Sequence, residues 1–374
     1  MNGTRITYVI TDLDVGGVPL HLARLAHAIR EFGFLPRVVS LAPIGAIGER
    51  LVAAGISIES CYARGPSDVG VIARLSRLLC RHRPSLVHAF LFHANLAACL
   101  AAPLAGISSR RVICEIQTVE IERPWHLTVG GMTHRMCACV VGNSPSVVEH
   151  LRQRAHMAAS RLCCISGGVD VAAIQSAQPL PRAELGVDDD CAIVLWVGRL
   201  DPVKGLDELL AAFRIVDTGR RTMLLLVGDG PYRPRVESMI REYGLGNRVR
   251  LLGRRSDVAE VMKTADVFAF PSRTEGMPNA LLEAMAAGLA AVATDVAGCR
   301  DVVVDGETGL LVPGGDVGAL TAAMRRLLVD DGLRRALGAR AARHAGAQYS
   351  FHRCVTRYAA LYDRVLREVP LRVI

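Results

Sequence analysis

Aromatic residues are scarce in this chain of 374 residues, since Phe, Trp and Tyr together make up 5% of it. Proteins that hold single-stranded nucleic acid stack its bases on aromatic side chains, so the scarcity argues against nucleic acid as a partner. The formal net charge of +8 nevertheless favours anionic partners, such as phosphate groups or an acidic membrane surface. A basic face that contacts only solvent is the alternative.

Several motifs of nucleotide and metal chemistry are also missing. The glycine pattern GxGxxG is absent, which argues against a nucleotide-dependent oxidoreductase, and the absence of a Walker A pattern argues against ATP hydrolysis at a P-loop. The eleven cysteines form no CxxC pair, and most of them lie in apolar runs. This argues against a disulfide framework or a zinc site and predicts buried thiols in a reducing compartment.

Long apolar runs are missing as well. No stretch reaches about 18 uncharged apolar residues, the length that a membrane-spanning helix needs. The chain begins with the polar residues MNGTR and continues directly into a short apolar run. We therefore expect a cytoplasmic protein whose contact with a membrane, if it has one, is peripheral and on the inner face.

What the chain does contain is a repeated alternation of short apolar runs and helical patterns, which is typical of α/β domains with parallel sheets. The alternation occurs on both sides of a stretch at 177–190 that contains two prolines and an acidic run. We therefore predict two domains, 1–176 and 177–350, followed by a last helical segment at 351–374. The acidic run Asp188–Asp190 is expected to be solvated, and no metal site is predicted.

The stretch 266–298 is the most informative part of the sequence. It reads as a strand at Val267–Phe270, a polar loop, a helix at Asn279–Ala287 and a second strand. Glu275 lies in the loop, and Glu283 lies about one turn into the helix. Ligands of such sheets bind beyond the carboxyl ends of the strands, so both acids can reach the hydroxyls of a sugar or ribose. Ordinary surface glutamates are the alternative.

Other chemistry-bearing residues also follow predicted strands. Arg199 and Lys204 come after the strand at 192–197, where a guanidinium fork and an ammonium group can hold phosphate. His88 and His93 flank the end of a strand at 86–90, where a histidine can act as a base or simply pack. Glycine turns that let a ligand approach the backbone follow four predicted strands: Gly16-Gly17, Gly198, Gly228-Asp229-Gly230 and Gly253-Arg254.

Together these motifs resemble family 4 of the retaining glycosyltransferases, the "group 1" enzymes of the GT-B type. The resemblance covers most of the chain and is carried by GRLDPVKG at 198–205, GDG at 228–230, LLGR at 251–254 and EGMPNALLEAMAAG at 275–288. It implies two Rossmann-like domains whose parallel sheets face an interdomain cleft. The first domain would bind the acceptor, the second would bind the nucleotide-sugar donor, and the last helix would cross back to the first. The resemblance also implies a reaction that needs neither a metal nor another cofactor.

The resemblance also assigns roles to individual residues. Arg199 and Lys204 would hold the donor diphosphate and stabilise the leaving group, Glu275 would face the donor sugar, and Glu283 would bind the ribose. The remaining donor contacts would come from the first-domain turn, the glycine turns of the second domain and the start of the glutamate-bearing helix: Gly16, Gly17, Gly198, Gly228, Gly230, Gly253, Arg254, Gly276, Met277, Pro278 and Asn279.

The sequence departs from the family at two places. Many relatives carry a histidine after the strand at 112–116 that contacts the donor sugar, whereas Gln117 or Thr118 stands there in this chain. The first glycine turn is followed by VPLH, where relatives often have an acid. Either the sugar or the acceptor differs, or activity is reduced. We expect His93 and Gln117 to contact the sugar or the acceptor.

The function expected from the resemblance is transfer of a hexose from a nucleotide sugar, expected to be UDP-linked, to a saccharide or lipid-linked acceptor. Such reactions build cell-envelope polysaccharides and glycolipids. The alternative is a module that binds nucleotide sugars on the same fold with weak or no transferase activity. An anionic membrane surface is the further partner that the basic charge suggests.

Overall fold

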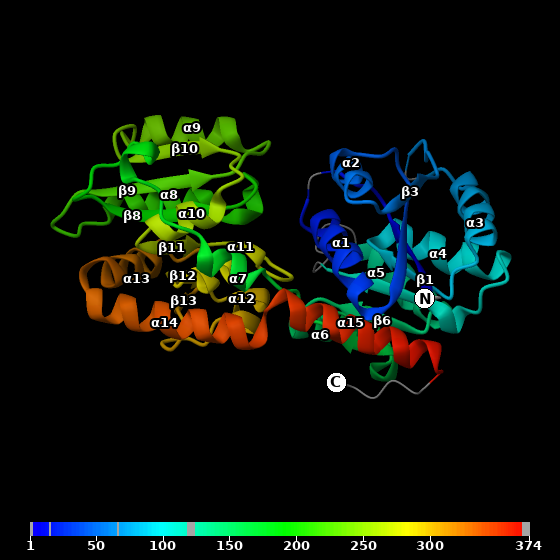
Figure 1. Ribbon diagram of the computed structural model, residues 1–374. Helices are drawn as coiled ribbons and strands as arrows, with labels where there is room; N and C mark the ends of the chain where they lie inside the picture. The colour runs from blue at the N-terminus through cyan, green and yellow to red at the C-terminus, as the bar shows by residue number, and fades with distance from the viewer. Residues whose placement is uncertain (1–2, 15, 66, 118–123, 369–374) are drawn as a thin grey trace. The chain divides into compact units, whose positions relative to one another are not determined.

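The computed structural model describes residues 3–14, 16–65, 67–117 and 124–368. The chain forms two compact units, Met1–Gly167 with Arg353–Ile374, and Gly168–His352 (Figure 1). This division falls before the predicted boundary at 176 and 177. The reason is that Val169 and Ile174 are buried in the core of the second unit.

The first unit is built on a seven-stranded sheet with the order β3-β2-β1-β4-β5-β6-β7, in which every neighbouring pair is parallel. The strand order changes direction between β1 and β4, so the loops that follow these two strands diverge. The strands are β1 (Thr4–Ile10), β2 (Phe34–Ser40), β3 (Ser57–Ser60), β4 (Leu86–Phe90), β5 (Val112–Ile116), β6 (Cys139–Gly142) and β7 (Leu162–Cys164).

The helices of the first unit connect these strands, as parallel pairing requires. α4 is rich in alanine, which lets it pack closely between α3 and the sheet. The helices are α1 (Gly17–Ala28), α2 (Ala46–Ala53), α3 (Gly70–His82), α4 (Phe92–Leu104), α5 (Pro124–Thr133), α6 (Pro145–Arg154) and the last helix, α15 (Phe351–Leu366).

The second unit contains a six-stranded parallel sheet with the order β10-β9-β8-β11-β12-β13. Its strands are apolar on both faces and separate two cores, as expected for a sheet covered by helices on both sides. The strands are β8 (Ala192–Val197), β9 (Thr222–Val227), β10 (Val249–Gly253), β11 (Val267–Phe270), β12 (Ala290–Thr294) and β13 (Leu310–Val312).

The helices of the second unit alternate with its strands, as the sequence predicts for an α/β domain. α11 follows β11 and ends before Gly288, whose φ of 84° is the left-handed conformation of a helix C-terminus. The helices are α7 (Val171–Ser176), α8 (Leu206–Ile215), α9 (Arg233–Glu242), α10 (Val258–Thr264), α11 (Asn279–Ala286), α12 (Ala297–Val302), α13 (Val317–Val329) and α14 (Asp331–Gln348).

The last helix belongs to the first unit from Arg353 onward. Tyr358 and Tyr362 are fully buried there. The Tyr358 hydroxyl donates to Glu115 Oε2 at 2.7 Å, and the Tyr362 hydroxyl lies 2.9 Å from His88 Nδ1. His88 is therefore a packed histidine of the interior, which was one of its two predicted roles.

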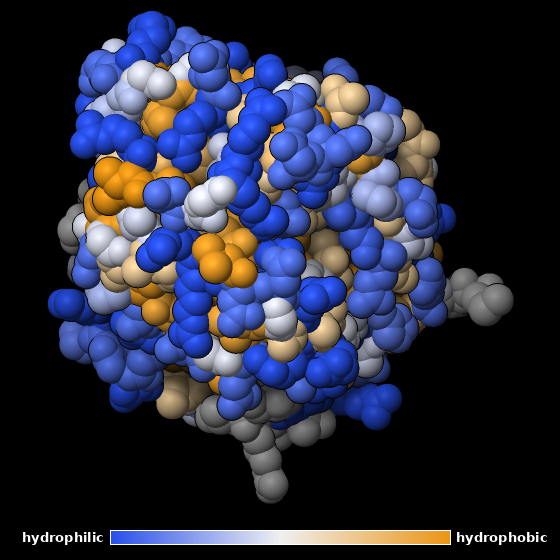
Figure 2. Space-filling model, turned by 90° about the vertical axis from the view of Figure 1, so that its left-hand side faces the viewer, coloured by the Kyte–Doolittle hydropathy of each residue, from blue (hydrophilic) through white to orange (hydrophobic). Residues whose placement is uncertain are grey.

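The cysteines are free thiols, and the face shown in Figure 2 is mainly hydrophilic. All eleven cysteines lie in the described ranges as free thiols, and most are buried. Within those ranges, each helix is too short or too polar to cross a bilayer. On the face that Figure 2 shows, hydrophilic residues predominate and hydrophobic residues form small groups among them, as is usual for a surface in contact with water.

Candidate functional site

In the second sheet the strand order reverses between β8 and β11, which pair directly through Val194 and Val267. Connections on the two sides of such a point run apart, which leaves room for a ligand at the carboxyl edge. The loop after β8 carries Arg199 and Lys204, and the loop after β11 carries Glu275. The fold thus brings together residues that are more than 70 positions apart in sequence.

Lys204 and Glu275 form an ion pair across this point. Lys204 Nζ lies 2.7 Å from Glu275 Oε1, and the two side chains are 22% and 9% exposed. The two loops are also joined through the backbone, because the Arg273 amide donates to the Val203 carbonyl at 2.8 Å. The ammonium group is therefore fixed in a largely buried place but remains partly open to solvent.

Arg199 is held differently. Its guanidinium lies 2.5 Å from the Asp201 carboxylate, while its side chain is 68% exposed. Asp201 also accepts from the Val203 amide at 3.2 Å, so it fixes both the loop and the arginine. Since a guanidinium has five N–H donors, Arg199 keeps donors for an anionic ligand.

Two glycines allow the loops of this edge to pack against each other. A Cβ atom on Gly228, whose φ is 131°, would lie 1.8 Å from the Gly198 carbonyl oxygen. A Cβ atom on Gly205, with φ 67°, would lie 1.9 Å from the Pro271 oxygen. No other residue type fits either position. The Gly228 amide also donates to the Gly253 carbonyl at 2.7 Å, so the turns after β8, β9 and β10 are connected.

The start of α11 completes this edge. Met277 and Pro278 are buried, Pro278 precedes the first helical turn, and Asn279 is exposed at its start. Glu283 follows one turn later and is half-buried. The free N–H groups of a helix N-terminus favour anions and oxygen atoms.

Two residues near this edge were not singled out from the sequence. Asp201 precedes a proline and a short helical turn, a cap signal that the motif already contained. A Cβ atom on Gly298 would lie 2.7 Å from the carbonyl oxygens of both Glu275 and Gly276, and no sequence signal indicates this contact. Close by in α12, burial and the Glu275 carboxylate raise the pKa of the Cys299 thiol, so it stays protonated.

The first-unit candidates lie at the carboxyl edge of the first sheet. Gly16 precedes α1 with an extended backbone, and Gly17 begins the helix and is exposed. His93 lies in the first turn of α4, and Gln117 follows β5, where its amide group donates to Glu115 Oε1. Thr118, the alternative to Gln117, lies outside the described residues.

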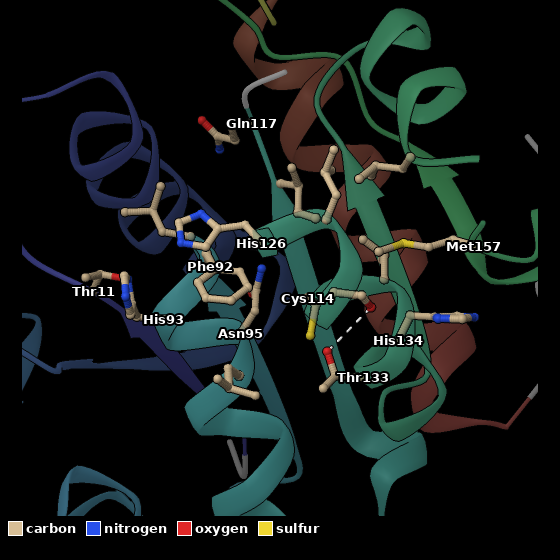
Figure 3. Close-up of a pocket in the computed structure, with 17 residues that line it drawn as sticks. Thr11, Phe92, His93, Asn95, Cys114, Gln117, His126, Thr133, His134 and Met157 are labelled. Carbon is tan, nitrogen blue, oxygen red and sulfur yellow. Dashed lines mark hydrogen bonds between the residues drawn. The ribbon is translucent and has the colours of Figure 1, made fainter. Parts of the chain in front are cut away.

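His93 and Gln117 line one cavity of the first unit (Figure 3). It has a volume of about 250 Å³ and lies where α4, α5 and the end of β5 meet. Phe92 and His126 also line it, and their rings stack with centroids 3.8 Å apart. This cavity was not predicted from the sequence, because its walls come from segments far apart in the chain.

Two family models together match most of the chain. "Glycosyltransferase Family 4" matches residues 15–173, and "Glycosyl transferases group 1" matches residues 178–344. Phosphatidyl-myo-inositol mannosyltransferase from Mycobacterium leprae is 32% identical over 359 residues, which cover 88% of each chain.

Other similar proteins match over different lengths. N-acetyl-alpha-D-glucosaminyl L-malate synthase from Bacillus anthracis is 31% identical over 187 residues, so the match spans about half of its length. The Anabaena protein HepE, solved in complex with UDP and glucose, has a TM-score of 0.86 over 96% of this chain and 99% of its own, with 22% identity. That likeness establishes the GT-B fold.

Proposed function

We infer the function from the family: this chain belongs to glycosyltransferase family 4, the group 1 glycosyl transferases, and has the GT-B fold. We propose that it is a retaining glycosyltransferase that moves a hexose from a UDP-sugar to a saccharide or lipid-linked acceptor of the cell envelope. The names of its relatives support this class of substrate. The Mycobacterium leprae relative is a mannosyltransferase of phosphatidyl-myo-inositol, and HepE was solved with UDP and glucose.

The single observation that carries the proposal is the Lys204–Glu275 pair beside Arg199 at the switch point of the second sheet. In the proposed donor complex, Lys204 and Arg199 bind the diphosphate and stabilise the negative charge that develops when the glycosidic bond to UDP breaks. Glu275 faces the sugar, and Glu283 binds the ribose hydroxyls. The amides at the start of α11 and in the glycine turns approach the remaining oxygen atoms.

The proposal is tested by replacing the three charged residues one at a time. Arg199→Ala, Lys204→Ala and Glu283→Ala should each lower transfer or donor hydrolysis, by about 10²–10³ for the two cations that contact developing charge. Matched controls are Lys263→Ala in α10, which removes the chain's second lysine, and Arg326→Ala on the exposed side of α13. Full activity in all three site variants would refute the assigned donor site.

The donor itself can be identified by thermal shift. A ligand that binds only the folded protein raises its apparent stability by mass action, so the correct nucleotide sugar should raise Tm most in a panel at equal concentrations. The same shift should be small in Lys204→Ala. An equal shift in wild type and variant would place the ligand elsewhere.

A binding module without catalysis is the second candidate function. The motivating observation is Gln117, which stands where relatives often carry a sugar-contacting histidine and which is engaged with Glu115. Calorimetry with UDP and UDP-sugars, together with a product assay over many acceptors, separates the two functions. Tight binding without turnover would favour the module.

Peripheral membrane contact is proposed from the charge of α3. Arg77 and Arg81 are exposed on this helix, and Arg81 also pairs with Glu59. Val69 at the start of the helix and Tyr62 in the loop before it are 80% and 66% exposed. Exposed basic and apolar side chains on one segment favour an anionic lipid surface. Co-sedimentation with liposomes should increase with anionic lipid content and fall in the double variant Arg77→Ala, Arg81→Ala. Independence from anionic lipid would refute the contact.

A further inference from the structure

The cavity of the first unit opens where ligands of parallel sheets bind. Thr11 follows β1, His93 follows β4 and Gln117 follows β5, and all three line the cavity. β1 and β4 are the neighbouring strands between which this sheet changes direction. The cavity therefore lies at the switch point of the first sheet, in the position that the Lys204–Glu275 pair occupies in the second. Figure 3 shows His93 beside Thr11, and Phe92 beside His126.

Several of the polar side chains that line the cavity are engaged in hydrogen bonds within the first unit. Asn95 donates to the Glu115 carbonyl at 2.9 Å and accepts from its amide at 3.3 Å. The Thr133 hydroxyl donates to the Val129 carbonyl at 2.9 Å, and His134 Nδ1 lies 2.5 Å from the Gly131 carbonyl. Among the described residues that line the cavity, none is Asp, Glu, Lys or Arg. The wall therefore presents mainly hydrocarbon and aromatic surface.

An aromatic group forms one side of the cavity. The stacked pair of Phe92 and His126 is met nearly edge-on by Trp125, with ring centroids 5.2 Å from Phe92 and 4.2 Å from His126. Trp125 is 53% exposed. Trp125 does not line the cavity itself, but its indole contacts two rings that do, so it lies next to the apolar wall and partly in water.

A second apolar cavity adjoins the first. It has a volume of about 290 Å³ and shares Thr11, His93 and Leu96 with the first cavity as lining residues. Its other walls are mainly apolar side chains of α3 and α4 and of the loops that follow β2 and β3, among them Leu41, Val71, Ile72 and Ala97, with the polar side chains of Asp12 and Asp68. Leu96 therefore separates two apolar spaces, which together provide more room for hydrocarbon than either alone.

We propose that the first cavity binds the hydrocarbon chain of a lipid-linked acceptor, so that this unit selects an amphiphile over a free saccharide. The inference rests on the proposed function and specifies which of its two acceptor classes the chain uses. The hydrocarbon lies between α4 and α5. The polar end of the acceptor lies at the rim formed by Thr11, His93 and Gln117, at the carboxyl edge of the sheet.

Binding of n-alkyl glucosides of increasing chain length tests the inference without any donor. The chain has two tryptophans, and Trp196 is fully buried in the core of the second unit, so changes in emission report on Trp125. Below the micelle-forming concentration, the emission change should saturate, and affinity should rise about fourfold per methylene until the chain fills the cavity. Methyl glucoside should give no saturable change.

Variants distinguish the cavity from general adsorption to the surface. Leu96→Phe places a larger side chain in the shared wall and should weaken octyl glucoside binding about 16-fold, the loss of roughly two buried methylenes. Gly130→Val, which projects a side chain into the cavity from α5, is a second variant in case the first does not fold, as judged by circular dichroism. Leu104→Phe, at an exposed position of α4, the helix that carries Leu96, is the matched control and should bind octyl glucoside as wild type does.

Each outcome decides the inference. Saturable binding that is lost in Leu96→Phe or Gly130→Val and kept in Leu104→Phe supports it. Absence of binding, an emission change that never saturates, or equal affinity in all folded variants overturns it. Calorimetry with UDP on the same wild-type sample reports on the proposed donor site separately, so that failure of the donor site and failure of the lipid cavity are distinguishable.

Discussion

Glu115 is the charged side chain that organises the interior of the first unit. It is fully buried, and it accepts from Tyr358 of the last helix and from Gln117 at the cavity. His88 Nε2 lies 3.1 Å from its carboxylate. Burial alone would raise the pKa of Glu115, but His88, His21 and Gln117 outweigh it and hold the pKa below its usual value. The carboxylate thus fixes Gln117 and the last helix at once.

In the variant Glu115→Gln, the free energy of unfolding should depend less on pH in the acidic range than it does in the wild type. A carboxyl whose pKa is lower in the folded state binds its proton less readily there, so acid favours unfolding. The stabilisation is complete above the unfolded pKa, near 4.5, and is lost as the pH falls below it through the folded value. The variant should lose about 1–3 kcal/mol of unfolding free energy at neutral pH.

Denaturant unfolding of wild type and Glu115→Gln across the acidic range measures this effect. The wild-type free energy of unfolding should fall more steeply below pH 4.5 than that of the variant. Glu31→Gln, at an exposed position, should follow the wild type. Parallel curves for wild type and Glu115→Gln would show that Glu115 does not contribute in this way.

The position of the proposed donor residues at strand ends was largely predictable, because the sequence marks the strands before them clearly. Lys204 and Glu275 meet at one sheet edge, as expected for residues that follow neighbouring parallel strands, and Arg199 lies on the same loop as Lys204. The direct pairing of Lys204 with Glu275 was not predictable, since sequence does not specify which loop contacts which. For the same reason the stacking of Phe92 on His126 could not be predicted.

At the scale of elements, α12 supports the loop that carries Glu275. Gly298 in this helix meets the carbonyl oxygens of Glu275 and Gly276 so closely that even a methyl group would lie 2.7 Å from both. The backbone of the loop therefore rests directly on the helix. We infer that the position of Glu275 depends on the absence of a side chain at 298.

Replacing Gly298 with alanine should displace this loop. We expect a loss of about 1–3 kcal/mol in unfolding free energy from overpacking, and a loss of transfer activity that persists at temperatures where the variant is fully folded. Gly318→Ala in α13 is the matched control, because its Cβ atom would only approach Asp316 Oδ1 to 3.4 Å. Denaturant unfolding and donor consumption measure the two effects, and unchanged activity in folded Gly298→Ala would contradict the account.

Buried elements were predicted better than exposed ones. β4, β8 and β11 match the predicted ranges, because each is a continuous apolar run bounded by proline, glycine or polar residues. α9 and β3 were not predicted. α9 is dominated by charged residues and buries only Val236, Met239 and Ile240, and β3 is a half-exposed strand at a sheet edge. Where burial is slight, the apolar pattern that identifies an element is weak.

The whole molecule consists of two units with separate cores. Most residues proposed to hold the donor lie in the second unit, and the apolar cavity lies in the first. The sequence predicted two α/β domains from the repeated alternation of strands and helices. The exact division differs because α7 packs against α10 and α11, a tertiary contact that composition does not reveal.

The reaction should proceed without a divalent metal. In the proposed donor complex, Arg199 and Lys204 would supply the positive charge that a metal provides to the diphosphate in other transferases. Transfer measured before and after extensive treatment with EDTA should therefore be equal. A loss that added Mg²⁺ or Mn²⁺ restores would show that these two cations are not sufficient.

We propose that this chain transfers a sugar with retention from a nucleotide donor held by Arg199, Lys204 and Glu275. Proton NMR can follow the anomeric signals during a reaction with the UDP-sugar selected by thermal shift and an alkyl glycoside acceptor. We expect a product with the anomeric configuration of the donor, formed by wild type and Lys263→Ala and lost in Lys204→Ala. A product of inverted configuration, or undiminished product from Lys204→Ala, would contradict it.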